Sequence, residues 1–329
     1  MNNLYPLKFK PIFKEKIWGG GKIHSVLKYG SAPASNCGEA WLLSSFDEND
    51  TIIKNGFLKG NSLGDIIEIY MDELVGDSVY NEFENTFPLL IKAIDANEWL
   101  SVQVHPNDDY AERNDMHNGK TEMWFIADAK ENSQLIAGFN KKINPDTYNK
   151  HLNSGSITDI LEYKTVKKGD VIFIPAGVVH AIGPDILLFE IQQSSDATYR
   201  IYDYNRKDKN GNLRELHTKQ ALEVINFTEN NSFVKSTDNI KNTYELIVND
   251  KHFAVVYNNL GTRIVKDYTD IDSFVILLCT EGNISICDNN NYKETVNFGE
   301  LVLIPANITE VEIESKGEAS FLEIFYPNK

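Results

Sequence analysis

Short apolar or alternating segments, bounded by turn residues, recur along the chain. The clearest are residues 87–94, 100–104, 122–127, 171–174 and 186–191. Segments of this length and pattern are typical of β-strands rather than helices. The pattern therefore predicts a mainly β protein.

A few segments carry helical signals instead. Ser62 and Asp65 have the spacing of a capping box before the apolar residues 66–71, and Thr218 is placed to cap a helix over 219–225. Two shorter helices are expected over 108–113 and 145–152.

A polar stretch at residues 228–232 follows the last predicted helix and precedes a new series of strands. Polar segments between patterned regions are typical of linkers. We therefore expect one domain over residues 1–230 and a second over 231–329.

One segment of the sequence is repeated, because residues 169–176 recur in similar form at 299–306. In each copy a glycine and an acidic residue lead into an apolar strand that ends at a proline, which cannot donate to a sheet ladder. Two related barrels are implied. The first copy continues to His180, whereas the second has Glu310 at the corresponding position, and no histidine follows His252. The second barrel is therefore predicted to be metal-free and structural.

The net charge of the chain limits the classes of binding partner. The 329 residues have a formal net charge of −16 and a pI near 4.9. A nucleic-acid site or a site for an anionic membrane needs a basic face, so both are excluded as main partners. An anionic small substrate stays compatible, because charges beyond about 8 Å are largely screened.

The remaining composition indicates a cytoplasmic protein. No apolar run is long enough to cross a bilayer, and residues 1–6 do not form a charged leader with an apolar stretch. Cys37, Cys279 and Cys287 form no Cys-x-x-Cys pair, which predicts reduced thiols rather than disulfides or a thiolate metal site.

Gln103 and His105 alternate with Val102 and Val104, so strand geometry sends the two polar side chains to one face. Burying such a pair without partners costs several kcal/mol, and a bound metal would satisfy both. Taken alone, the pair fits a solvent-exposed face equally well.

Two further residues complete a ligand set. Glu122 begins an otherwise apolar strand, and His180 follows a tight turn. Separately, Glu122 fits a surface carboxylate and His180 fits a hydrogen-bonded core histidine. With Gln103 and His105 they form a nitrogen and oxygen set suited to zinc or another divalent transition metal.

These residues also carry a family resemblance. Gly169, Pro175, Gly177 and His180 have the spacing of the second cupin motif, although cupins often have asparagine where this chain has Pro184. The pair Gln103 and His105 with Glu122 resembles a stretched first cupin motif. The long separation of Glu122 from His105 and the sequence segments at 16–20, 101–108, 119–124 and 199–203 resemble the type I mannose-6-phosphate isomerases. The resemblance is to their compact bacterial form and covers nearly the whole chain.

The resemblance implies two cupin-type jelly-roll barrels, of which the C-terminal one is degenerate. It also implies one Zn²⁺ per chain and interconversion of mannose 6-phosphate and fructose 6-phosphate through an enediol. The implied metal ligands are Gln103, His105, Glu122 and His180.

Three residues are catalytic candidates. Arg200 matches the catalytic arginine of the family, and its permanent charge suits an enediolate. Lys120 lies two residues before Glu122 and is either an acid or base at the metal or a solvated surface lysine. Glu190 lies inside an apolar strand and is either a base with a raised pKa or a partner of Arg200 or His180.

Two other functions stay open at this point. Two histidines and a carboxylate also describe iron-dependent cupin dioxygenases, and a non-catalytic sugar-binding cupin would keep the barrels without needing Arg200. Gln103, Lys120 and Arg200 together favour the isomerase. We expect a sugar phosphate substrate and a monomer or weak homo-oligomer.

Overall fold

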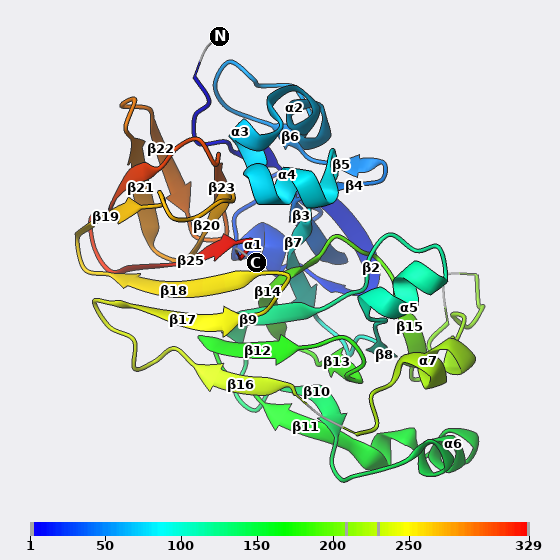
Figure 1. The fold of residues 1–329 in the computed structure, drawn as a ribbon. Coiled ribbons are helices and arrows are strands. Elements are labelled where there is room, and N and C mark those ends of the chain that lie inside the picture. The colour runs from blue at the N-terminus through cyan, green and yellow to red at the C-terminus, as the bar shows by residue number, and fades with distance from the viewer. Residues whose placement is uncertain (1–2, 208–209, 229–230, 328–329) are drawn as a thin grey trace. The chain divides into compact units, whose positions relative to one another are not determined.

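The computed structural model describes residues 3–207, 210–228 and 231–327, and its fold is mainly β, as predicted (Figure 1). The chain packs as two compact units. Unit 1 consists of Met1–Ile12, Trp41–Lys92 and Ser236–Lys329, and unit 2 of Phe13–Ala40 and Ala93–Lys235. The predicted domain boundary after residue 230 lies outside the described residues, and the division at that point stays a prediction.

The strands of unit 2 belong to two sheets. Among the described residues, one sheet has seven strands in the order β16-β12-β9-β14-β7-β2-β3, and the other has five in the order β11-β10-β13-β8-β15. The bounds of the first are β16 (Phe233–Ser236), β12 (Asp170–Ile174), β9 (Glu122–Ala129), β14 (Ile186–Gln193), β7 (Leu89–Ala96), β2 (Ile12–Gly20) and β3 (Cys37–Leu43). Those of the second are β11 (Leu161–Thr165), β10 (Gln134–Phe139), β13 (His180–Ile182), β8 (Val102–Val104) and β15 (Tyr199–Tyr202).

Both faces of the five-stranded sheet are covered. One face packs against the seven-stranded sheet, with Trp124 and Leu188 meeting Leu135 and Ile182 in one apolar core. The other face packs against α6 (Pro145–Asn153), η1 (Ile157–Ile160) and α7 (Thr218–Val224) in a second apolar cluster. Side chains of this sheet therefore point either at the facing sheet or at the helices.

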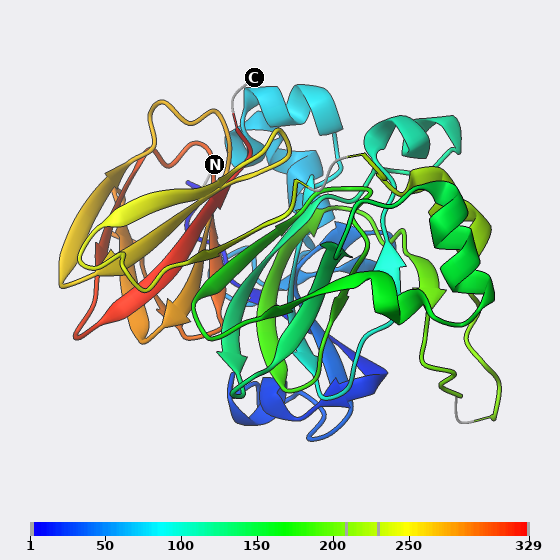
Figure 2. The ribbon, with the colours of Figure 1, turned by 90° about the horizontal axis from the view of Figure 1, so that it is seen from below.

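Unit 1 contains a second pair of sheets, formed by the yellow to red strands in Figure 2. Their orders are β17-β18-β25-β20-β23 and β19-β24-β21-β22, and one apolar core includes residues of both. The bounds are β17 (Tyr244–Asn249), β18 (Ala254–Leu260), β25 (Ala319–Phe325), β20 (Val275–Glu281), β23 (Leu301–Ile304), β19 (Arg263–Asp267), β24 (Glu310–Glu314), β21 (Asn283–Asp288) and β22 (Lys293–Asn297).

The remaining elements are short. The helices are α1 (Lys22–Ser25), α2 (Leu63–Tyr70), α3 (Asp72–Val75), α4 (Asp77–Phe83) and α5 (Asp108–Arg113). The strands are β1 (Phe9–Lys10), β4 (Ser45–Phe46), β5 (Asn49–Asp50) and β6 (Ile52–Ile53).

The predicted elements are confirmed with shifts of a few residues at their ends. The capping box of α2 is present, because Ser62 Oγ accepts from Asp65 N (3.2 Å) and the Asp65 carboxylate accepts from Ser62 N (3.1 Å). The predicted cap of α7 is wrong, since Thr218 is the first helical residue and His217 precedes it as the N-cap.

The sequence repeat has the same local structure in both units. Gly169 and Gly299 have φ of 86° and 82°, a region that favours glycine, and each leads into an apolar strand, β12 or β23. The next strand begins at His180 in one copy and at Glu310 in the other. The correspondence between these two positions is therefore confirmed.

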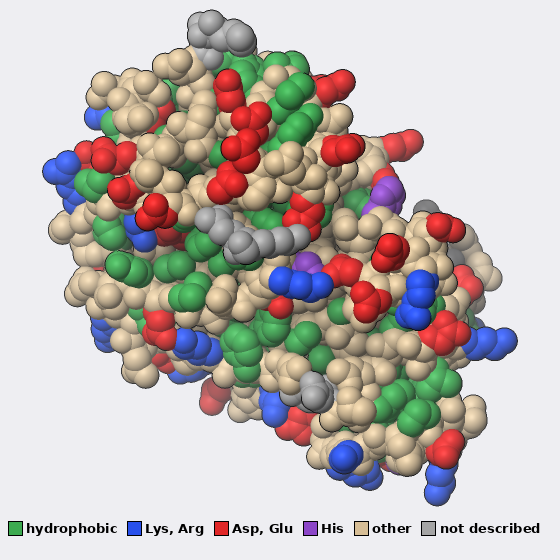
Figure 3. Space-filling model, in the orientation of Figure 1, with side chains coloured by type: hydrophobic (Ala, Val, Ile, Leu, Met, Phe, Trp, Pro, Cys, Tyr) green, Lys and Arg blue, Asp and Glu red, His purple; other side chains and the backbone are tan. Residues whose placement is uncertain are grey.

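None of the described helices is both long enough and apolar enough to cross a membrane. On the face drawn in Figure 3, lysine and arginine side chains lie scattered among carboxylates rather than in a continuous basic patch.

Candidate metal centre

Three neighbouring strands align three polar residues in one row. Gln103 on β8 is paired with His180 on β13 and with Arg200 on β15. Residues directly opposite each other in adjacent strands point to the same face of the sheet. Val102 and Val104 pack among the helices on the other face, so the row faces the seven-stranded sheet.

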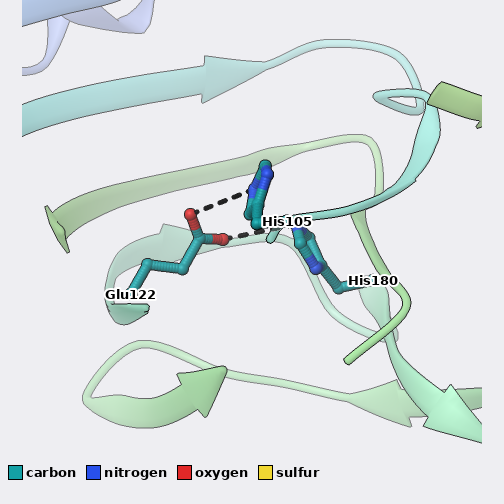
Figure 4. A group of neighbouring side chains, drawn as sticks. All are labelled: His105, Glu122 and His180. Carbon is teal, nitrogen blue, oxygen red and sulfur yellow. Dashed lines mark ion pairs between the residues drawn. The ribbon is translucent and has the colours of Figure 1, made fainter. Parts of the chain in front are cut away.

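Glu122 approaches this row from the seven-stranded sheet. It begins β9, two positions before Trp124, whose side chain lies in the core between the sheets. Its two carboxylate oxygens lie 3.4 Å from His105 Nε2 and 3.3 Å from His180 Nε2. Figure 4 shows the carboxylate directed at both rings.

Backbone carbonyls fix the orientation of both imidazoles. Nδ1 of His105 lies 2.7 Å from Ala197 O, and Nδ1 of His180 lies 2.9 Å from Val178 O. A carbonyl oxygen can only accept, so each Nδ1 carries the proton and donates. Each Nε2 therefore directs a lone pair at Glu122, the arrangement common in metal-binding histidines.

The ligand atoms of these side chains face one another in a buried site. His105, Glu122 and His180 are at most 1% exposed, and their ligand atoms all lie within 4.8 Å of one another. Among the described residues, His105 Nε2 and both oxygens of Glu122 have no hydrogen-bond partner, although Lys120 Nζ forms an ion pair with Glu122 Oε2 at 3.1 Å. Lone pairs that face one another in a buried site repel unless a cation lies between them, so the donor set fits a metal ion.

Electrostatics keep these donors in the forms that bind metals. Burial lowers the pKa of His105 to about 3, with a further contribution from Lys120, and burial also lowers the pKa of His180. Burial alone would raise the pKa of Glu122, but the charge of Lys120 opposes burial, and this pKa is held well below its usual range. The imidazoles are thus neutral and the carboxylate is charged near neutral pH.

The fourth predicted ligand lies at the same point. The amide nitrogen of Gln103 is 3.3 Å from His180 Nε2. Rotating the amide group by half a turn places its oxygen there instead, and an amide oxygen is a suitable metal ligand. The structure thus brings all four predicted ligands together.

Lys120 also lies within this cluster and is not a solvated surface lysine. It is 4% exposed, and its Nζ lies 3.1 Å from Glu122 Oε2. Burial alone would lower its pKa, but the carboxylates of Glu122 and Glu190 outweigh burial, and the pKa is raised.

Glu190 has a partner that the sequence did not suggest. It is buried opposite Trp124 in the adjacent strand, and its Oε2 accepts a hydrogen bond from Trp124 Nε1 at 3.0 Å. Its charge also contributes to the raised pKa of Lys120. Glu190 thus lies near enough to Lys120 for its charge to act on that lysine.

Arg200 lies in a group of basic residues that surrounds Asp203. The Asp203 carboxylate accepts hydrogen bonds from Arg206 and from Arg214, the latter from Nε at 2.7 Å. Burial lowers the pKa of Arg200, and the charges of Arg214 and Arg206 lower it further. The Nε atoms of Arg200 and Arg206 are buried without hydrogen-bond partners among the described residues.

Sequence reasoning missed several residues around the site. Arg214, Glu215 and His217 lie in an irregular segment before α7 without a motif of their own, and only the fold brings them to Arg200. The carbonyls of Val178 and Ala197 belong to residues with unremarkable side chains, so the sequence held no signal for them.

Comparisons with known proteins found similar sequences and a similar fold. Residues 6–121 match the family model of the phosphomannose isomerase type I catalytic domain. The chain is 41% identical over 225 residues to the mannose-6-phosphate isomerase ManA of Bacillus subtilis, covering 67% of this chain and 68% of that protein. It is 33% identical over 284 residues to the mannose-6-phosphate isomerase of Streptococcus mutans, covering 85% and 87%. The crystal structure of a mannose 6-phosphate isomerase from Bacillus subtilis matches with a TM-score of 0.86 and 31% identity, over 98% of this chain and 99% of that chain.

Proposed function

We propose that this chain, which belongs to the type I phosphomannose isomerase family, interconverts mannose 6-phosphate and fructose 6-phosphate. The main support for the proposal is the buried cluster of His105, Glu122 and His180, whose ligand atoms lie within 4.8 Å of one another. The cytoplasmic location and the oligomeric state stay predictions from the sequence.

Gln103, His105, Glu122 and His180 are proposed to hold one zinc ion. Two imidazoles, a carboxylate and an amide form a mixed nitrogen and oxygen set. Such a set suits zinc, whereas magnesium and calcium prefer sets made of oxygen ligands alone. When bound, the ion supplies Lewis acid chemistry to the oxygens of the substrate.

The isomerisation moves a proton between two adjacent carbons through an enediol, so the site needs a proton carrier. Lys120 and Glu190 are the candidates, because both are buried beside the cluster. Lys120 lies 3.1 Å from Glu122, whereas Glu190 also accepts from Trp124. Lys120 is thus placed to hold or move the proton, with Glu190 stabilising its charged form.

Arg200 is proposed to stabilise the negative charge that develops on the substrate oxygen. It occupies the row of Gln103 and His180, and its buried Nε donates to no other group in the part of the chain that the structure describes. Removing one preorganised donor of this kind typically lowers turnover by ~10²–10³.

The phosphate is proposed to bind near Arg206 and Arg214. Together with Arg200 they bring three positive charges to Asp203, which offsets one of them. This local excess can attract a phosphate despite the net charge of −16, because distant charges are screened.

A coupled assay on the purified chain tests the proposal. Fructose 6-phosphate should form from mannose 6-phosphate without oxygen, and formation should stop on chelation and return with added zinc. Arg200→Ala should lower turnover by ~10²–10³ while the metal content stays at that of the wild type.

Two results would contradict the proposal. Consumption of oxygen with iron bound would indicate a dioxygenase, and tight binding of the sugar phosphate without product would indicate a binding module. Equal turnover with and without chelator, after metal analysis has verified removal, would contradict the metal assignment.

A further inference from the structure

The backbone of Arg200 lies on an open sheet edge. β15 is the last strand in the order β11-β10-β13-β8-β15. An edge strand exposes backbone N–H and C=O groups that have no partner strand on that side. The position of Arg200 along this edge therefore depends on what bonds these groups.

One residue bonds both of them. The backbone N–H of His217 donates to Arg200 O over 2.7 Å, and Nδ1 of His217 accepts from Arg200 N over 3.2 Å. Because Nδ1 accepts, the neutral imidazole carries its proton on Nε2. His217 thus takes the place of a neighbouring strand at this point.

The same segment also holds the guanidinium. Nη1 of Arg200 donates to the backbone oxygen of Glu215 over 2.8 Å. The segment from Glu215 to His217 therefore fixes the backbone of Arg200 and one end of its side chain, while Nε stays without a partner among the described residues.

The N-terminus of α7 is consistent with this role. His217 is the N-cap, and its carbonyl accepts from Ala221 N at 2.8 Å, yet its side chain makes no capping hydrogen bond. A side chain at this position commonly accepts from the first turn of its own helix. Here the imidazole is turned to Arg200 instead.

We propose that His217 is a positioning residue for the isomerisation, in which its Nδ1 and backbone N–H hold Arg200 in register with Gln103. The inference rests on the proposed function, because it assigns Arg200 to the developing negative charge. His217 acts through Arg200 and not on the substrate.

Two substitutions separate the imidazole acceptor from the bulk of the side chain. His217→Asn can place an amide oxygen near the position of Nδ1, whereas His217→Leu removes the acceptor. Since a displacement of about 1 Å can cost 10²-fold, we expect His217→Leu to lower kcat by about tenfold with KM nearly unchanged. His217→Asn should keep kcat within about threefold of the wild type.

A double-mutant cycle shows whether the effect passes through Arg200. In an Arg200→Ala background, His217→Leu should cause less than about a twofold further loss of kcat. A merely structural role would instead give the same loss in both backgrounds. If His217→Leu does not fold, His217→Gln takes its place, because its oxygen lies one bond further out.

The outcomes are distinct. Equal kcat in His217→Leu and the wild type, equal losses in His217→Leu and His217→Asn, or a full loss in the Arg200→Ala background would each overturn the positioning role while leaving the proposed function intact. A wild-type enzyme without turnover would overturn the proposed function and this inference together.

Discussion

At the scale of single residues, the site depends on Glu122, which faces two histidines and a lysine at 3.1–3.4 Å. Its carboxylate is fully buried and charged. A charge in this position is stable only when cations or donors surround it. Glu122 thus links the metal ligands to Lys120.

Glu122→Gln removes the charge with little change in shape. We expect metal affinity to fall by at least about 10²-fold, because loss of an outer partner alone costs 10–100-fold. Turnover should fall with it. Elemental analysis measures the bound metal, and the coupled assay measures turnover on the same sample. Glu310→Gln, at the position of the repeat in unit 1 that corresponds to His180, should change neither quantity. Full metal content in Glu122→Gln would remove Glu122 from the ligand set.

At the scale of elements, the turn between β12 and β13 places His180 and also contacts His105, the residue directly after β8. Gly177 in this turn has φ of 85°, and its N–H donates to His105 O over 2.9 Å. An added Cβ would lie 3.0 Å from Val224 O. This turn therefore needs glycine for its conformation and for its close packing.

Gly177→Ala should lower the free energy of unfolding by about 1–2 kcal/mol, the cost of a left-handed conformation in a residue with a Cβ. It should also weaken metal binding, because the turn positions both histidines. Gly155→Ala is the matched control, with φ of 71° and no atom within 4 Å of the added Cβ. A similar loss of metal affinity in both variants would show that general destabilisation is the cause.

The capping box of α2 allows a test of an element in unit 1. Ser62→Ala removes the acceptor for Asp65 N and should lower the free energy of unfolding by about 1 kcal/mol in urea. Ser62→Thr keeps a hydroxyl and should lose less. We expect no change of kcat in either variant, and an unchanged urea midpoint in Ser62→Ala would mean that the box does not stabilise the chain.

At the scale of the whole molecule, the free energy of unfolding should depend on pH through Glu300 in unit 1. Burial alone would raise its pKa, but Lys54, the N–H of Asn297 and Lys8 outweigh burial and lower it to about 2, from 4.5. Its carboxylate lies 2.8 Å from Lys54 Nζ and 3.0 Å from Lys8 Nζ. Because the folded pKa is depressed, the stabilisation is fully present above about pH 4.5 and is lost as pH falls towards 2.

Glu300→Gln should therefore be less stable than the wild type at pH 7, by about 2–3 kcal/mol, and the difference should shrink between pH 4.5 and 2. Urea unfolding at a series of pH values measures this. Glu310→Gln serves as an exposed control. A difference that does not change with pH would mean that the contribution comes from packing rather than from charge.

The sequence determined most of the secondary structure and the four candidate ligands. Alternation along 101–105 directed Gln103 and His105 to one face, because side-chain direction in a strand follows from the backbone alone. The capping box and the repeated glycine turns were likewise readable, since their hydrogen bonds and conformations are local. The cap of α7 is not readable from the sequence, because the side chain of His217 accepts from Arg200 N rather than from its own helix.

Only the tertiary structure decided which contacts these residues make. Three contacts join residues that are separated in the chain. They are the approach of Glu122 to both histidines, the hydrogen bond from Trp124 to Glu190, and the hydrogen bond from Arg200 N to His217. The assembly of unit 1 from three separate segments also joins separated parts of the chain. Such contacts arise from the burial of sheet faces against one another, which depends on the whole chain, whereas strand periodicity and turn conformation depend only on neighbouring residues.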